Sequence, residues 1–144
     1  MIKQTAILIL ISFVLGFSSC SSDDAIDGGP CSYEQYEGLA MIIAIEDAPA
    51  GENNCPDNPK RVAYKFKPND ISVVDSYLFP NVQDSLQYFE IGDGQNPSQA
   101  WLDNNEMEVG SEYTCLREEI TQGTCTPVIF TFTDPSLDLD GACD

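Results

Sequence analysis

The feature that most limits the fold of this chain is a series of short segments in which apolar and polar residues alternate. Residues 61–67 alternate most regularly, with Val62, Tyr64 and Phe66 on one side and Ala63 with basic residues on the other. A period of two residues is typical of a half-buried β-strand. No helical period of normal length is visible beyond the apolar run at the N-terminus. The pattern predicts an all-β domain.

Other segments fit the same architecture. Residues 39–45 are apolar on both faces and predict a central strand. Residues 113–120 and 128–132 flank a Thr-Gln-Gly-Thr turn and predict a hairpin, in which Pro127 marks a strand start or an edge. Weaker strand candidates are residues 71–78, 86–91 and 107–109. Residues 98–103 are expected to form one helical turn that places Trp101 and Leu102 on the core.

One local pattern narrows the fold further. Residues 109–113 (VGSEY) resemble the approach to the penultimate strand of fibronectin type III and immunoglobulin-like domains, in which a Tyr hydrogen-bonds back to the chain. About seven short strands in this length predict a β-sandwich. The resemblance supports an immunoglobulin/fibronectin-III-like architecture and implies no activity. The chain departs from the pattern because residues 39–45 contain no Cys to receive an inter-sheet disulfide.

The N-terminal apolar run indicates where the protein resides. Lys3 precedes residues 6–17, which are apolar apart from Ser12 and Gly16. This stretch is shorter than the roughly 20 residues that span a bilayer. Such a stretch fits a signal peptide. Residues 17–20 (FSSC) resemble the lipobox of bacterial lipoproteins, with a Phe where Leu is usual. The resemblance implies cleavage before Cys20 and a lipid, such as palmitate, on that residue. The alternative is an ordinary secretory signal.

The residues after Cys20 resemble the start of surface lipoproteins of Bacteroidota, in which acidic residues follow the lipidated Cys. Here Ser-Ser-Asp-Asp occupies residues 21–24. The resemblance implies a lipid-anchored, surface-exposed protein of the outer membrane, although the sequence leaves open which face of that membrane it occupies. The expected organisation is a lipoprotein signal peptide (1–19), a lipidated flexible tether (20–30) and a β-sandwich domain with disulfides (31–144).

Charge and composition exclude several functions. The chain carries a formal net charge of −18, and loss of residues 1–19 leaves five basic against 24 acidic residues, or −19. Such a charge repels nucleic acid and anionic membrane surfaces, so we expect contact with the membrane only through the lipid. The chain contains no histidine, which excludes Ser-His-Asp catalysis and His-ligated metals.

Five cysteines follow Cys20, and an exported chain is expected to join them in disulfides. Cys115 and Cys125 flank the predicted hairpin turn and form the first candidate pair. Cys31 and Cys143 lie near the two ends of the domain and form the second. Cys55 is then left over in a loop, and the sequence does not fix the pairing.

Three groups of side chains are candidates for a site. Asp134, Asp138 and Asp140 alternate before a Gly and are weak candidates for structural calcium, since calcium prefers oxygen ligands in flexible loops. Glu118 and Glu119 are adjacent carboxylates, but neighbouring strand residues point to opposite faces. A sugar-stacking platform could be drawn from five aromatic residues, although most are expected in the core. These are Tyr33, Tyr36, Tyr77, Tyr88 and Trp101.

These features favour a lipid-anchored cell-envelope lipoprotein with a non-catalytic binding or structural role at the cell surface. The expected partner is a surface protein or a glycan, and no cofactor is expected apart from possible structural calcium. The alternative is a glycan- or calcium-binding accessory module. A hydrolase is the third hypothesis. It ranks last because no histidine is present and no convincing carboxylate pair is visible.

Overall fold

The computed structural model describes residues 30–140 and Cys143. The strands are β1 (Ser32–Asp47), β2 (Lys60–Pro68), β3 (Gln87–Phe89), β4 (Glu112–Gln122) and β5 (Val128–Phe132). The helical elements are the 3-10 helices η1 (Ile71–Ser76) and η2 (Pro80–Val82) and the short α1 (Gln99–Asn104). The predicted signal peptide 1–19, the lipid attachment site Cys20 and the predicted tether up to residue 29 lie outside the described residues.

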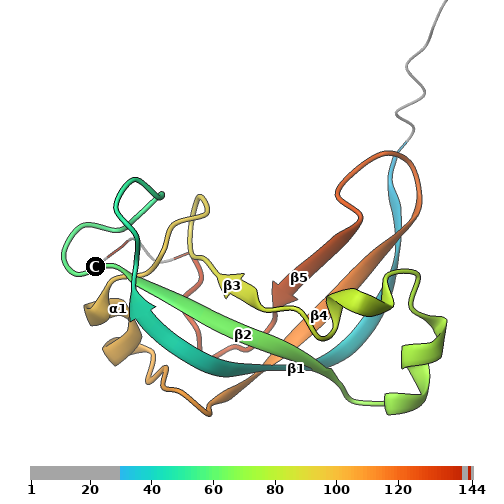
Figure 1. Cartoon of the computed structure of the whole chain (residues 1–144), viewed down its shortest axis with the longest axis horizontal. Coiled ribbons are helices and arrows are strands. Elements are labelled where there is room, and N and C mark those ends of the chain that lie inside the picture. The colour runs from blue at the N-terminus through green and yellow to red at the C-terminus, as the bar shows by residue number, and fades with distance from the viewer. Residues whose placement is uncertain (1–29, 141–142, 144) are drawn as a thin grey trace, which may run out of the picture.

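The strands form one antiparallel sheet in the order β3-β2-β1-β4-β5. The sheet twists and curls into a half-barrel, with η1 and η2 near one end and α1 at the other (Figure 1). The all-β prediction and the presence of disulfides are therefore confirmed. The described residues contain five strands in this single sheet, in place of about seven in a sandwich. The curl of the sheet, together with α1 and the segment after η1, covers the apolar face, so a second sheet is not needed to bury it.

Two predicted strands are absent from the described residues for local reasons. Residues 71–78 begin as η1 because the Asp70 side chain accepts a hydrogen bond from the Ser72 backbone N–H at 2.9 Å. An Asp in this capping position favours a helical turn over a strand. Residues 107–109 lie in the loop that precedes β4.

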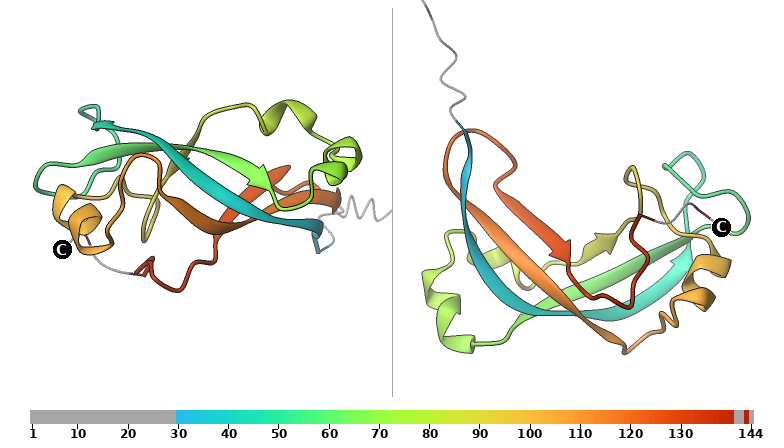
Figure 2. Two further views of the ribbon diagram at one scale, coloured as in Figure 1. Left: turned by 90° about the horizontal axis from the view of Figure 1, so that it is seen from below. Right: turned by 180° about the vertical axis from the view of Figure 1, so that it is seen from behind.

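β1 is longer than predicted and shapes the sheet. It spans 16 residues and pairs with β2 on one side and β4 on the other. A register shift between Ile42 and Ala44 bends it, as a bulge does, and Figure 2 shows the bend from two further sides. The opposite strand approaches so closely at Gly38 that a Cβ there would lie 2.4 Å from the Lys67 carbonyl oxygen. A glycine is therefore needed at this point of the curl.

The concave face of the sheet holds the core. Val62, Tyr64 and Phe66 of β2 are buried, as their alternation predicts. The Phe132 ring lies 5.0 Å from the Tyr64 ring and 4.8 Å from the Phe89 ring, so β5 packs across the concavity onto β2 and β3. Such edge-to-face aromatic contacts stabilise a small core beyond the area they bury.

α1 closes one end of this core, as predicted. Trp101 and Leu102 are buried, and the Ser98 hydroxyl caps the helix by accepting a hydrogen bond from the Trp101 N–H at 3.0 Å. The predicted Tyr corner is also present: the Tyr113 hydroxyl donates to the Glu106 carbonyl oxygen at 3.3 Å. This bond ties the start of β4 to the loop before it.

Both predicted disulfide pairings are wrong. Cys31 pairs with Cys125, and Cys55 pairs with Cys143. Cys115 is a buried free thiol on the concave face of β4, whereas Cys125 lies in the β4–β5 loop. That loop reaches the start of β1, because β1 pairs with β4 from its first residues onward.

Among the described residues no helix is long and apolar enough to cross a bilayer.

Candidate functional site

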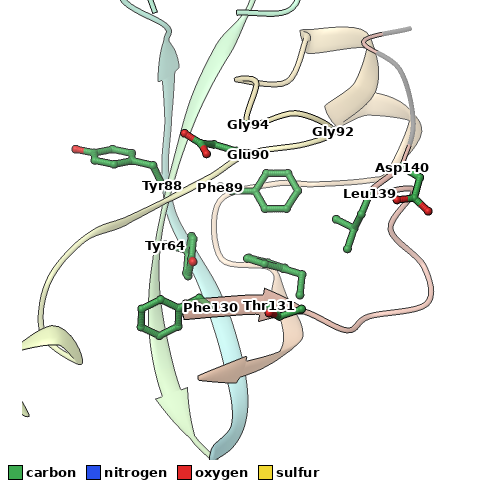
Figure 3. A pocket seen from close by; sticks show the side chains of 11 residues that line it. Tyr64, Tyr88, Phe89, Glu90, Gly92, Gly94, Phe130, Thr131, Leu139 and Asp140 are labelled. Atoms are coloured by element: carbon green, nitrogen blue, oxygen red, sulfur yellow. The ribbon is translucent and has the colours of Figure 1, made fainter. Parts of the chain in front are cut away.

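A hollow of about 390 Å³ opens between β3 and β5, the two edge strands of the sheet. We call it the edge hollow. The side chains of Tyr64, Phe89, Phe130 and Leu139 line it (Figure 3), as does that of Phe132. Phe130 and Phe132 are partly exposed, whereas Tyr64 and Phe89 are almost fully buried. The hollow therefore has a floor of aromatic rings between two strand edges, while most of its exposed surface is polar.

Carboxylates flank this floor. Glu90 follows β3 on one side of the hollow (Figure 3). Asp140 lies on the other side, in the segment after β5 (residues 133–140), which we call the C-terminal segment. Both side chains are exposed, and neither forms an ion pair with another described residue. The site therefore combines aromatic rings with a polar, negatively charged rim, a combination that suits a ligand with both cationic and apolar groups.

A second hollow of about 240 Å³ adjoins the first and shares Tyr88, Glu90 and Gly94 with it. Its polar side chains are mostly bound to one another. Arg61 pairs with Glu52 and lies over the Tyr88 ring at 5.0 Å. The Asn96 amide donates to Glu52 at 2.8 Å. This network fixes the Tyr88 ring, which points away from the edge hollow (Figure 3).

The carboxylate pair Glu118 and Glu119 is divided between the two faces of β4, as the strand geometry predicts. Glu119 is fully buried and pairs with buried Arg117. Its other oxygen accepts a hydrogen bond from the Leu78 N–H at 2.6 Å. Glu118 lies on the opposite face and accepts from Gln35 at 2.8 Å. The two carboxylates therefore cannot face each other across one substrate.

The Arg117–Glu119 pair instead holds the segment of η1 and η2 on the concave face. Arg117 donates to the Phe79 carbonyl oxygen at 2.6 Å and lies 3.8 Å from the centre of the Tyr77 ring. Two nitrogens of Arg117 and the Tyr77 hydroxyl are buried without a hydrogen-bond partner among the described residues. None of the hollows described above is lined by this pair, so it acts as internal support.

The five aromatic residues considered for a sugar platform do not form one. Tyr36, Tyr77 and Trp101 are core residues with exposures of 6 %, 6 % and 2 %. Tyr33 is partly buried, and its hydroxyl donates to the Thr126 carbonyl at 3.0 Å. Tyr88 alone of the five is half exposed, and it lines the second hollow while its ring points away from the edge hollow (Figure 3).

The three calcium candidates are also separated in role. Asp134 accepts hydrogen bonds from the Ser136 hydroxyl and N–H and from the Thr114 N–H. These bonds, that of the Ser136 hydroxyl foremost, lower the pKa of the Asp134 carboxyl. Asp138 and Asp140 are exposed, and Asp140 lies at the edge hollow. No group of three or more potential metal-ligating side chains occurs within residues 30–140 and Cys143.

The sequence predicts some of these residues for other reasons. It predicts Tyr88 as an aromatic platform residue and Asp140 as a calcium ligand, and both lie at the edge hollow. It gives no local signal for Glu90 or for the rings of β5. Their signal is the position of β3 and β5 at the two edges of the sheet, which becomes visible only when the strand order is known.

Comparison of the chain with models of known families, with curated proteins and with solved structures finds no match.

Proposed function

We propose that this protein is a lipid-anchored outer-membrane lipoprotein that binds a partner at the cell surface without catalysing a reaction. The observation that supports the binding role most is the edge hollow, which joins a floor of aromatic rings to two exposed carboxylates that form no ion pair with a described residue. Concave sites that combine aromatic groups with a few charged groups are typical of binding sites. The anchor rests on the sequence around Cys20.

The arrangement of the domain fits this proposal. The chain enters the described part beside the β4–β5 loop, where Cys31 is bonded to Cys125 (Figure 1). Residues 48–59, residues 92–98, α1 and the C-terminal segment lie at the other end (Figure 1). The second hollow draws Glu52, Asn53 and Asn96 from these loops. An anchor at Cys20 would therefore leave this end of the domain facing away from the membrane.

A glycan is the second candidate ligand, and Tyr88 is the observation that favours it. The Tyr88 side chain is 50 % exposed and has Glu90 and Asn53 nearby along the second hollow. Aromatic rings and polar side chains together bind sugars. One exposed ring provides a small platform, so a protein partner remains our first choice.

Two experiments test the proposal. Labelled palmitate should enter the wild-type protein in its native host and should not enter a Cys20→Ala variant. For binding, a photo-crosslinking amino acid is placed at residue 140, where the exposed Asp140 side chain lies at the edge hollow (Figure 3). The matched control is residue 109, where Val109 is 61 % exposed away from both hollows. On whole cells, position 140 should capture one discrete partner that position 109 does not. Equal capture at both positions, or none at residue 140, contradicts a binding role for the hollow.

A further inference from the structure

We propose that the edge hollow binds an extended basic peptide segment, which adds to the free edge of β5 as a sixth strand. This inference rests on the proposed binding function and names the class of partner. β-strand addition requires an unpaired strand edge, room beside it for alternate side chains and a partner of complementary charge. The structure provides each of these.

The hydrogen-bond pattern shows which groups of β5 are free. The Thr133 N–H donates to the Thr114 carbonyl at 2.9 Å, and the Ile120 N–H donates to the Pro127 carbonyl at 2.9 Å. Hydrogen-bonded and non-bonded pairs alternate along an antiparallel ladder. The backbones of Thr131, opposite Leu116, and Ile129, opposite Glu118, therefore also bond to β4. The backbone groups of the remaining residues of β5 face away from β4. They are Val128, Phe130 and Phe132.

These outward backbone groups have no partner in the described residues. β5 is the last strand of the sheet, and no described side chain bonds to the backbone of Val128, Phe130 or Phe132. An exposed edge of this kind is a template for another strand. β5 spans five residues, or about 17 Å, which is a normal strand length.

The second edge faces the same hollow. The Lys60 N–H donates to the Pro97 carbonyl at 2.8 Å, and the Ala48 N–H donates to the Pro59 carbonyl at 3.0 Å. This alternation directs the backbone N–H and C=O groups of Val62 and Tyr64 towards β3. The backbone groups of Tyr88 in β3 then face away from β2, at the free edge of the sheet. A strand bound to β5 can therefore also meet β3, because the edge hollow is lined by both edges.

The side chains of the hollow specify apolar residues at alternate positions of the peptide. Phe130 and Phe132 project onto the concave face, where they contact Tyr64 and Phe89. Residues directly opposite each other in neighbouring strands project onto the same face. The peptide residues that hydrogen-bond to Phe130 and Phe132 would therefore place their side chains in the hollow of about 390 Å³.

Charge selects a basic partner. Glu90 and Asp140 flank the floor, none of the described residues that line the edge hollow is basic, and the whole chain carries −18. Complementary charge speeds association and disfavours like-charged partners. A second copy of this chain would bring another strongly negative molecule to the same edge, so pairing of β5 with β5 is disfavoured.

The test uses the protein with Cys20→Ala and a synthetic peptide that alternates Lys with Val or Phe and has blocked termini. Binding is measured by fluorescence anisotropy at 0.15 M salt, and the protection of backbone amides is measured by hydrogen exchange. The peptide should bind, and the amides of Val128, Phe130 and Phe132 should become protected. Glu90→Gln and Asp140→Asn should each weaken binding about two- to fivefold, the range for exposed charge pairs. Glu108→Gln, which lies outside the hollow, is the matched control.

Two modified peptides separate strand addition from simple attraction between opposite charges. N-methylation of the Val and Phe residues removes the N–H groups that would bond to β5 and should weaken binding about tenfold or more. N-methylation of the Lys residues should leave most of the affinity. Equal binding of both modified peptides, or no protection of the β5 amides, would overturn the inference.

The outcomes also distinguish this inference from the proposed function. If residue 140 captures a surface partner on cells but the alternating peptide does not bind, the binding function stands and strand addition is wrong. If residue 140 captures only polysaccharide, the ligand is a glycan and the peptide inference is again wrong. Formation of a dimer that blocks the hollow would identify a second copy as the occupant and would also overturn it.

Discussion

At the scale of single residues, the largest departure from the sequence reading is the burial of charge. Tyr113, Cys115, Arg117 and Glu119 occupy every second position of β4 and share its concave face. Both charged side chains are fully buried. Alternation alone predicts the strand and the opposite orientations of Glu118 and Glu119. It does not predict that a charged pair takes the inner face, because that depends on the carbonyl of Phe79 and the N–H of Leu78, which approach from a distant segment.

Removal of one partner of this pair should destabilise the protein strongly. Arg117→Met leaves the Glu119 carboxylate buried without its cation, and breaking a buried pair costs about 3–5 kcal/mol. The double variant Arg117→Met/Glu119→Leu should recover most of the loss, since no buried charge is left. Urea unfolding measures the three free energies of unfolding. A double variant no more stable than Arg117→Met would contradict this account.

Cys115 should be chemically inert in the folded protein. Burial raises the pKa of its thiol to about 12, and the thiolate is the reactive form. In a Cys20→Ser protein with intact disulfides, iodoacetamide at pH 8 should leave the native state unmodified and should alkylate one thiol per chain in urea. Rapid alkylation of the native state would show that the β4 core opens readily.

At the scale of elements, the sequence predicts the regular strands and misses those that depend on their neighbours. β2, the β4–β5 hairpin and the α1 turn follow from alternation, turn residues and the Ser98 cap. The first half of β1 (residues 32–38) is rich in polar residues and has no strong apolar pattern. It becomes a strand because β4 pairs with it along its length. Such long-range pairing is not encoded in the local sequence.

The curl of the sheet should depend on Gly38. In Gly38→Ala the new methyl group would lie 2.4 Å from the Lys67 carbonyl oxygen and 2.5 Å from the Phe66 ring. We expect a loss of about 1–3 kcal/mol in the free energy of unfolding, as for other overpacked sites. The neighbouring exposed substitution Glu37→Ala should change stability by less than about 0.5 kcal/mol. Equal effects of the two substitutions in thermal or urea unfolding would rule out a close-approach role.

At the scale of the whole molecule, the two disulfides fix the two ends of the domain. Cys31–Cys125 lies where the chain enters, and Cys55–Cys143 joins the C-terminal segment to a loop at the far end (Figure 1). The presence of disulfides follows from the number of cysteines in an exported chain, but their partners do not. The pairing depends on the curl of the sheet, which brings together cysteines that are far apart in the sequence. The separation is 94 positions for Cys31 and Cys125 and 88 positions for Cys55 and Cys143.

The distal disulfide should control the edge hollow as well as stability. Cys55 and Cys143 hold the C-terminal segment, which supplies Leu139 and Asp140 to the hollow. Replacement of both residues by Ser should lower the free energy of unfolding by about 2–5 kcal/mol, because each bond closes a long loop. Replacement of Cys31 and Cys125 by Ser should cost a similar amount but leave the hollow in place. Hydrogen exchange of the Leu139 and Asp140 amides should therefore rise in the first double variant and not in the second. Increased exchange of these amides in both variants would show that the two ends do not act separately, and the C-terminal segment would then depend on the stability of the sheet as a whole.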